Sequence, residues 1–279
     1  MTLHHLSLQD RKRYQNLDLS KKIELSRTVI KKAFQRIPRE QTALAWTGGK
    51  DSTLLLWLLR KVCQDGNLPL PKIMFVDEGD VFPEIRQFIK RLSIDWGFTY
   101  SVAHNSDVSS QAKKIGDMIP VSFLNKRNRQ EINRLGFSEK AFPYEPESFV
   151  GNHLMKTVAT NIWIEKNDIK ALYVGVRWDE QPARAEDNYF RPIDQPDHTR
   201  VEPILHFKEK DVWEAIHQYH LPYVKLYEQG YRSLGARGTT QKTDNKPAWK
   251  QDLKSTKERS GRKQDKEKIM ERLRALGYM

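Results

Sequence analysis

Cysteine is nearly absent from this sequence, and long apolar runs are missing. Cys63 is the only cysteine among 279 residues. One cysteine excludes, within a single chain, a disulfide, a multi-cysteine metal site and a cysteine-held iron–sulfur cluster. No stretch approaches the ~18 to 20 apolar residues of a membrane span, and Met1–His5 lacks the charged-then-apolar order of a secretory signal. We therefore expect a cytoplasmic protein without a membrane segment.

Positive charge is in excess, with a formal net charge of +12. This balance suits an anionic ligand, an acidic protein partner or nucleic acid. Part of the excess lies near the two ends, in residues 11–22 and 242–268. Because charge runs are more often solvated faces than binding surfaces, nucleic-acid binding is an open alternative and not the favoured one.

The most informative stretch is Thr47-Gly48-Gly49-Lys50-Asp51-Ser52, which follows a short apolar run and precedes the apolar Leu54–Leu59. This order predicts a buried strand that turns tightly into a helix. Paired glycines and the free amides of a helix start favour a bound anion. Lys50 adds a point charge for phosphate and Ser52 a hydroxyl, while Asp51 suits a helix cap or a cation. The alternative is an ordinary turn with solvated charges.

Alternating strand and helix patterns predict an α/β fold, a doubly wound and mostly parallel sheet with helices on both faces. We expect strands at 42–46, 72–77, 99–102, 171–176 and 201–204, and helices at 21–37, 50–64, 84–92, 154–166 and 208–219. Residues 111–147 carry no strong period. The predicted boundaries are a polar N-terminal arm at 1–18, a main domain at 19–240, and a basic C-terminal tail with a terminal helix at 241–279.

Charged residues gather where two predicted strands end. In an open parallel sheet, ligands lie beyond the carboxyl ends of the strands. Asp77 ends one strand, and Arg177–Arg184 follows another. Arginine forks match phosphate or sulfate, and carboxylates can hold Mg²⁺. The candidate Mg²⁺ ligands are Asp51, Asp77, Asp179 and Glu180; the alternative is an ion-pair network that closes a loop.

Two of these blocks resemble known motifs. The segment Thr47–Ser52 is similar to the pyrophosphate-binding loop Ser-Gly-Gly-Lys-Asp-Ser of the ATP pyrophosphatase group, and only Thr47 departs from it. With Val76-Asp77 and Arg177–Ala185, it resembles the small subunit of bacterial sulfate adenylyltransferase. Trp178 stands where that family has a second arginine, so one anion contact of the family pattern is missing.

The third block, Tyr223–Gly235, is similar to phosphoadenosine phosphosulfate (PAPS) reductases and FAD synthetases, as is Thr239-Thr240. Together the blocks resemble the PAPS reductase family of the adenine nucleotide alpha-hydrolase-like superfamily, over most of residues 20–245. This resemblance implies a Rossmann-like, HUP-type adenine-nucleotide-binding domain. The implied ATP-binding residues are Thr47, Gly48, Gly49, Lys50, Asp51, Ser52, Asp77, Gly175, Tyr231, Ser233 and Gly235.

The leading hypothesis from this resemblance is adenylyl transfer from ATP, with Mg²⁺, to an oxyanion acceptor, with release of pyrophosphate. Such catalysis depends on positioning and charge stabilisation and needs no protein nucleophile. The candidate catalytic residues are Lys50, Asp51, Arg177, Asp179 and Arg184. Sulfate is the first acceptor to test, and by family analogy its uphill reaction would need a GTPase partner subunit.

Three alternatives stay open. The first is adenylylation of FMN, as in FAD synthetases. The second is a PAPS reductase, which is disfavoured because the nucleophilic cysteine of those enzymes lies near the C-terminus and no cysteine follows Cys63. The third is a non-catalytic nucleotide-binding or nucleic-acid-binding module. The sequence leaves open the acceptor, the partner, the oligomeric state and the role of the arm and the tail, including Glu258–Arg262.

Overall fold

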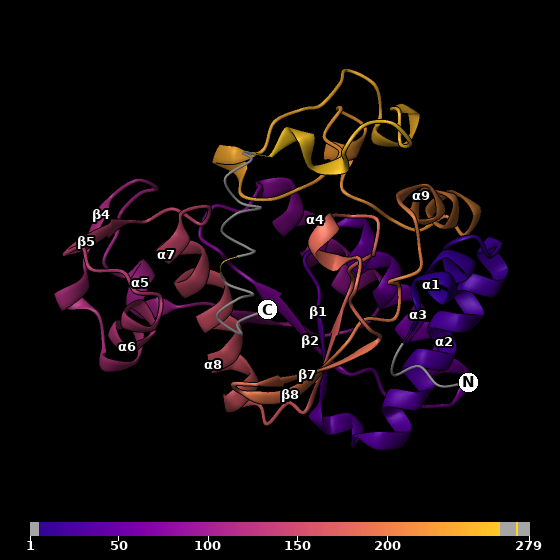
Figure 1. The fold of residues 1–279 in the computed structure, drawn as a ribbon, viewed down its shortest axis with the longest axis horizontal. Helices are drawn as coiled ribbons and strands as arrows, with labels where there is room; N and C mark the ends of the chain where they lie inside the picture. The colour runs from indigo at the N-terminus through magenta and orange to yellow at the C-terminus, as the bar shows by residue number, and fades with distance from the viewer. Residues whose placement is uncertain (1–5, 263–271, 273–279) are drawn as a thin grey trace.

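The computed structural model describes residues 6–262 and Arg272, and these form an α/β domain (Figure 1). Its α-helices are α1 (Leu8–Gln15), α2 (Leu19–Arg36), α3 (Lys50–Asp65), α4 (Pro83–Asp95), α5 (Ser106–Ser109), α6 (Lys126–Arg134), α7 (Phe149–Asn152), α8 (Ala159–Lys166) and α9 (Glu209–Gln218). Its strands are β1 (Thr42–Ala45), β2 (Lys72–Val76), β3 (Ser101–Ala103), β4 (Met118–Pro120), β5 (Ala141–Pro143), β6 (Ala171–Val174), β7 (Phe190–Asp194) and β8 (Asp197–Val201).

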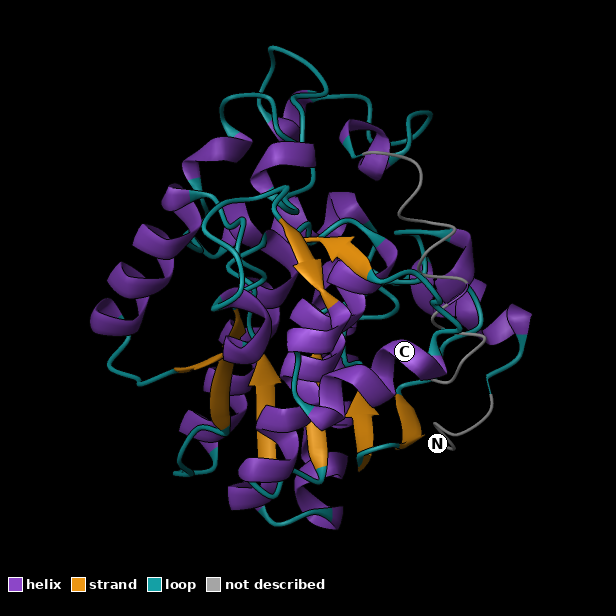
Figure 2. Ribbon diagram, turned by 90° about the vertical axis from the view of Figure 1, so that its left-hand side faces the viewer, coloured by secondary structure: helices purple, strands orange, loops and turns teal. Residues whose placement is uncertain are grey.

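The main sheet has six strands in the order β3-β2-β1-β6-β8-β7, and only the edge strand β7 is antiparallel to its neighbour. Helices cover both faces (Figure 2). The predicted doubly wound, mostly parallel α/β fold is confirmed. The chain builds outward from β1 to β2 and β3, then crosses to β6 on the other side of β1.

Alternating residues of the central strands face two different layers, as the period of two in a strand requires. Leu44 and Tyr173 belong to the large core cluster that also contains the buried faces of α2, α3 and α9. Ala43 and Met74 pack on the other face, in a cluster with Trp163 of α8. Both faces of the sheet are therefore buried, which explains why these strands read as continuous apolar runs.

The strand expected at Val201–Ile204 is wrong by several residues. β8 ends at Val201, and it forms a hairpin with β7 that sequence reasoning did not predict. The hairpin was not predicted because charged residues interrupt the apolar pattern that indicates a buried strand. The guanidiniums of Arg191 and Arg200 lie 3.6 and 3.1 Å from the fully buried carboxylate of Glu202, so the charges are paired inside the fold.

Residues 104–153 form a small lobe beside the sheet, at the left of Figure 1. It holds the two-stranded antiparallel sheet of β4 and β5, together with α5, α6 and α7, around its own apolar cluster, which includes Ile119, Ile132 and Phe142. Residues 111–147 show no clear hydrophobic period because the elements of this lobe are only three to nine residues long.

The first and the last described segments both contact the central domain. The polar N-terminal arm contains α1, whose Tyr14 is buried, and Arg11 donates to the carbonyls of Ala185 and Glu186 at 3.0 Å. Residues 241–262 lie over the sheet, in yellow at the top of Figure 1. The boundaries at residues 18 and 240 stay predictions, and most of the expected terminal helix lies outside the described residues. Among the helices that the structure describes, none is long and apolar enough to cross a membrane.

The packing of the large core cluster predicts how much stability is lost when a buried leucine is shortened to alanine. Leu58 of α3 is fully buried in the large cluster, so Leu58→Ala should lower the free energy of unfolding by about 2–5 kcal/mol in chemical denaturation. Ile94 of α4 is 71% exposed, and Ile94→Ala should change it by no more than about 0.5 kcal/mol. Equal losses in the two variants would contradict the packing described above.

Candidate active site

The loop between β1 and α3 is built for close approach of its backbone to a ligand. Gly48 has a φ of +75°, which side chains rarely adopt, and Gly49 precedes α3 without a side-chain cap. The Gly49 amide donates weakly to Thr47 Oγ1 at 3.3 Å, and the hydroxyls of Thr47 and Ser52 lie 3.1 Å apart. The predicted strand–turn–helix is therefore confirmed, and its amides and hydroxyls line a cavity.

Gly175 brings the end of β6 against this loop. A Cβ atom at Gly175 would lie only 2.9 Å from both Cα and N of Ser52. Contacts that short do not occur in real structures, so a side chain would force the two segments apart. Gly175 also lines the cavity, as its predicted role near ATP requires.

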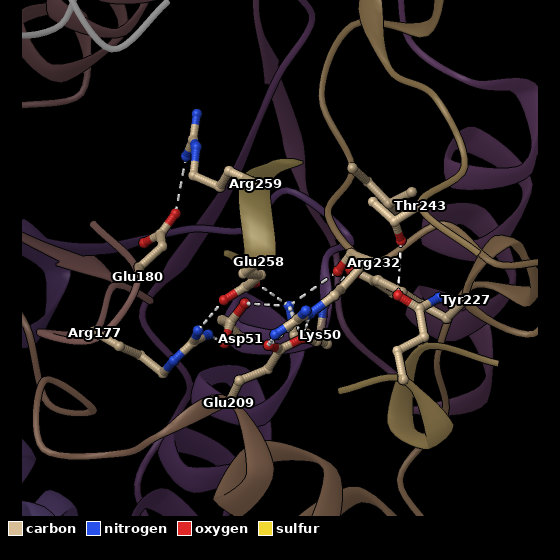
Figure 3. Close-up of polar contacts among 12 residues, drawn as sticks. Lys50, Asp51, Arg177, Glu180, Glu209, Tyr227, Arg232, Thr243, Glu258 and Arg259 are labelled. Carbon is tan, nitrogen blue, oxygen red and sulfur yellow. Dashed lines mark hydrogen bonds and ion pairs between the residues drawn. The ribbon is translucent and has the colours of Figure 1, made fainter. Parts of the chain in front are cut away.

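Lys50 does not extend freely into the cavity. Its ammonium is 1% exposed and contacts the carboxylate of Glu258, with Asp51 at 3.4 Å and Glu209 at 3.9 Å (Figure 3). Its backbone amide donates to the hydroxyl of Tyr227 at 3.0 Å. Burial opposes the charge, but Glu258 and the other anions raise the pKa of Lys50 overall. The ammonium is thus charged and already balanced by a carboxylate.

Arg177 lies in the same cluster and is fully buried. Its guanidinium contacts Asp51 and Glu258 (Figure 3). Its Nε donates to Asp179 at 2.9 Å. Burial alone would lower the pKa of Arg177, but Glu258 and Asp179 raise it above the usual value. Because all of its nitrogens contact carboxylates, Arg177 holds the site together and does not project into the cavity.

The four candidate Mg²⁺ ligands do not form one group, although Asp51 and Asp179 share the guanidinium of Arg177. Asp77 forms a bidentate pair with Arg86, at 2.6 and 2.9 Å. Asp179 accepts from the Glu209 amide at 2.8 Å as well as from Arg177, so it caps the start of α9. Among the described residues, no three acidic, histidine or cysteine side chains form a group that could hold a metal ion. These carboxylates therefore do not form a prepared Mg²⁺ site.

The cavity at this edge of the sheet has a volume of about 310 Å³. Arg184 lines it, and its Nε lies 3.5 Å from Glu180. Burial opposes ionisation of Glu180, but Arg184 and Arg259 lower its pKa. The cavity-lining residues that the sequence predicted are Thr47, Gly49, Lys50, Asp51, Ser52, Gly175, Glu180, Arg184, Ser233 and Gly235.

Tyr231, which was predicted near ATP, packs elsewhere, and Trp178 lies in the core. Tyr231 does not line the cavity and meets Phe82 edge-on, with ring centroids 5.5 Å apart. Trp178, which replaces the second arginine of the family block, donates from its indole nitrogen to the Asp187 carbonyl at 2.8 Å. It packs against Tyr189 with ring centroids 5.7 Å apart, so it is a core residue and no anion ligand.

Sequence reasoning missed the contribution of the tail. Glu258, Arg259 and Arg262 all line the cavity, although they lie about 200 residues after the loop. The only available signal was the motif Glu-Arg-Ser-Gly-Arg, an acid and two arginines around a glycine within a lysine-rich segment. Because charge runs are usually solvated, the sequence did not predict that this segment lines the cavity.

The family model described as the phosphoadenosine phosphosulfate reductase domain matches residues 41–242. The chain belongs to this family. Its matched region includes the loop, Arg177–Arg184 and Ser233, but it ends before the cavity-lining tail.

Relatives in this family carry different activities in their names. A Caenorhabditis briggsae protein named probable FAD synthase is 28% identical over 81% of this chain and 35% of its own length. Sulfate adenylyltransferase subunit 2 of Chelativorans sp. is 27% identical over 68% of this chain and 61% of its own length. The chain thus spans between about one third and three fifths of these relatives.

Solved structures show the same fold. Candida glabrata FMN adenylyltransferase superposes with a TM-score of 0.61 at 15% identity, over 92% of this chain and 94% of that one. PAPS reductase from Candida auris gives 0.54 at 15% identity, over 85% and 99%. At such low identity the likeness concerns the fold alone.

The close approach of Gly175 to Ser52 predicts that a side chain at position 175 distorts the loop Thr47–Ser52. Gly175→Ala should displace Ser52 and weaken pyrophosphate binding about tenfold or more in a calorimetric titration, because the new methyl group meets backbone atoms. Gly66→Ala is the matched control, since its methyl would meet the Leu68 side chain at 2.7 Å, at the other end of α3 from the loop. A loss of pyrophosphate binding in Gly66→Ala as large as in Gly175→Ala would contradict this account of the loop.

Proposed function

We propose that this chain binds ATP at the loop Thr47–Ser52 and transfers its adenylyl group to an oxyanion acceptor. The observation that carries the proposal is the loop itself: an uncapped helix start next to two glycines and two hydroxyls, at the carboxyl edge of a parallel sheet. Such a helix start binds phosphate through its amides and its dipole. The loop opens on the cavity of about 310 Å³, whose charged lining suits a nucleotide's phosphates.

In the proposed reaction, an acceptor oxygen forms a bond to the α-phosphorus as the bond from that phosphorus to the bridging oxygen breaks. Pyrophosphate leaves with the electron pair. The amides of Gly48–Ser52 and the Ser52 hydroxyl would hold the two outer phosphoryl groups. Arg184, which lines the cavity, would face the developing negative charge. Arg177 would keep Asp51 and the loop in position, since its guanidinium is occupied by carboxylates.

Sulfate is the first acceptor of the proposal. The family includes sulfate adenylyltransferase subunit 2, of which this chain covers about three fifths. A subunit of that kind implies a second subunit, and we propose a GTPase, because attack of sulfate on ATP is strongly uphill and needs a coupled source of free energy. Mg²⁺, where required, would come with the nucleotide's phosphates.

FMN is the second acceptor of the proposal. FAD synthase relatives match a larger share of this chain, and part of the cavity is apolar enough for a flat ring. The apolar lining includes Val81, Ile85, Ile164, Leu172 and Ile193. Reduction of an adenylyl sulfate is not proposed: Cys63 is buried, and burial raises the pKa of its thiol to about 11, so it is protonated near neutral pH.

A screen of acceptors tests the proposal. Sulfate or FMN should stimulate pyrophosphate release from ATP, measured with the full chain and, for sulfate, also with a GTPase subunit. Lys50→Met should reduce this release about a hundredfold. The physical reason is that Glu258, left without its ammonium partner, would add uncompensated negative charge beside the loop.

Lys61→Met is the control, because Lys61 is an exposed residue on the same helix. It should leave pyrophosphate release unchanged. Undiminished release in Lys50→Met would remove the loop from the mechanism, and failure of both acceptors would remove sulfate and FMN from the proposal.

A further inference from the structure

The segment after Lys257 is held firmly against the candidate site. It forms a short 3-10 helix, Glu258–Gly261, and the Gly261 carbonyl accepts from the Gln241 amide at 2.8 Å. The side chain of Glu258 is buried, and its carboxylate contacts both Lys50 and Arg177 (Figure 3). Burial opposes ionisation of Glu258, but Arg177 and Lys50 lower its pKa, so the carboxylate is charged and anchors the segment.

This anchor directs two further arginines at the cavity. Arg259 and Arg262 both line it, together with Arg184. Arg259 lies 3.0 Å from Glu180, which Arg184 also contacts, so two guanidiniums share one carboxylate. The cavity wall between them therefore carries an excess of positive charge.

Arg262, like Arg184, keeps one buried nitrogen without a hydrogen-bond partner among the described residues. The guanidinium of Arg262 donates to the Leu234 carbonyl, and the atom without a partner is its Nε. Burial and the neighbouring Arg259 lower its pKa to about 10. Gly235 makes room for this side chain, because a Cβ atom there would lie 3.2 Å from the guanidinium. A partly buried guanidinium with an unused donor favours a bound anion.

The charges that line the cavity also favour a bound anion. Among the described residues, the cationic lining is Lys50, Lys156, Arg184, Arg200, Arg259 and Arg262, and the acidic lining is Asp51, Glu78, Glu180 and Glu258. Lys50 pairs with Glu258, and Lys156 lies 3.1 Å from Glu78. Arg200 pairs with Glu202, and Asp51 contacts Arg177. The remaining lining charges are Arg184, Arg259 and Arg262 around the single carboxylate of Glu180.

We propose that Arg259 and Arg262, with Arg184, bind a tetrahedral oxyanion carrying two or more charges, and that Glu258 positions them. Arginine forks suit such an anion because they donate two parallel hydrogen bonds. The inference rests on the proposed function and deepens it: the anion is either the pyrophosphoryl part of the nucleotide or a sulfate-like acceptor. The C-terminal segment is then part of the binding site and no separate tail.

Calorimetric titration of the full chain with inorganic pyrophosphate and, separately, with sulfate distinguishes the two sources. Arg259→Gln and Arg262→Gln should each weaken binding of one probe about tenfold or more, and the probe that is affected identifies the anion. Lys257→Gln removes the same charge from an exposed neighbour and should bind both probes like the wild type. The variants Arg259→Lys and Arg262→Lys, which keep the charge and lose the fork, should give smaller losses and also carry the test if the glutamine variants fold poorly.

Wild-type affinity of the glutamine variants for both probes would overturn the inference, as would a wild-type protein that binds neither probe. The titration needs no turnover. Loss of binding in the arginine variants would therefore stand even if no acceptor stimulated pyrophosphate release, and unchanged binding would refute the inference without refuting adenylyl transfer.

Discussion

A buried carboxylate between two buried cations holds the candidate site together. Glu258 contacts Lys50, at the start of α3, and Arg177, after β6, and thereby ties the tail to both. Removing one member of such a cluster leaves a charge without a partner in the interior, which typically costs about 3–5 kcal/mol. The position of the loop, the shape of the cavity and the direction of the tail arginines all depend on this balance of charge.

The sheet explains why the site lies where it does. From β1 the chain proceeds to β2 and β3 on one side and later to β6 on the other, so the strand order reverses between β1 and β6. In open α/β sheets this reversal leaves a crevice at the carboxyl ends of the strands, where ligands bind. Gly175 lets β6 approach the loop backbone, and the tail closes the crevice from above (Figure 1).

Whether a feature of this structure can be predicted from the sequence depends on how far apart in the chain the interacting residues lie. Buried central strands and the glycine loop have local signatures, and the predicted β1–loop–α3 unit is confirmed. The contact of Glu258 with Lys50 joins residues 208 positions apart, and no local pattern encodes it. Likewise, Asp77 and Asp179 fall at strand ends as expected, but Arg86 and the start of α9 occupy their oxygens. The β7–β8 hairpin escaped prediction because its charged side chains are neutralised only by tertiary contacts with Glu202.

Hydrogen exchange measured by mass spectrometry with and without ATP tests the central claim most directly. That claim places the nucleotide's outer phosphates on the loop amides, beneath the anchored tail. Peptides that cover Thr47–Thr53 and Lys257–Arg262 should both exchange more slowly when ATP is added, while peptides from the lobe at 104–153 should not change. Protection confined to other segments, or no protection at saturating ATP, would contradict the account.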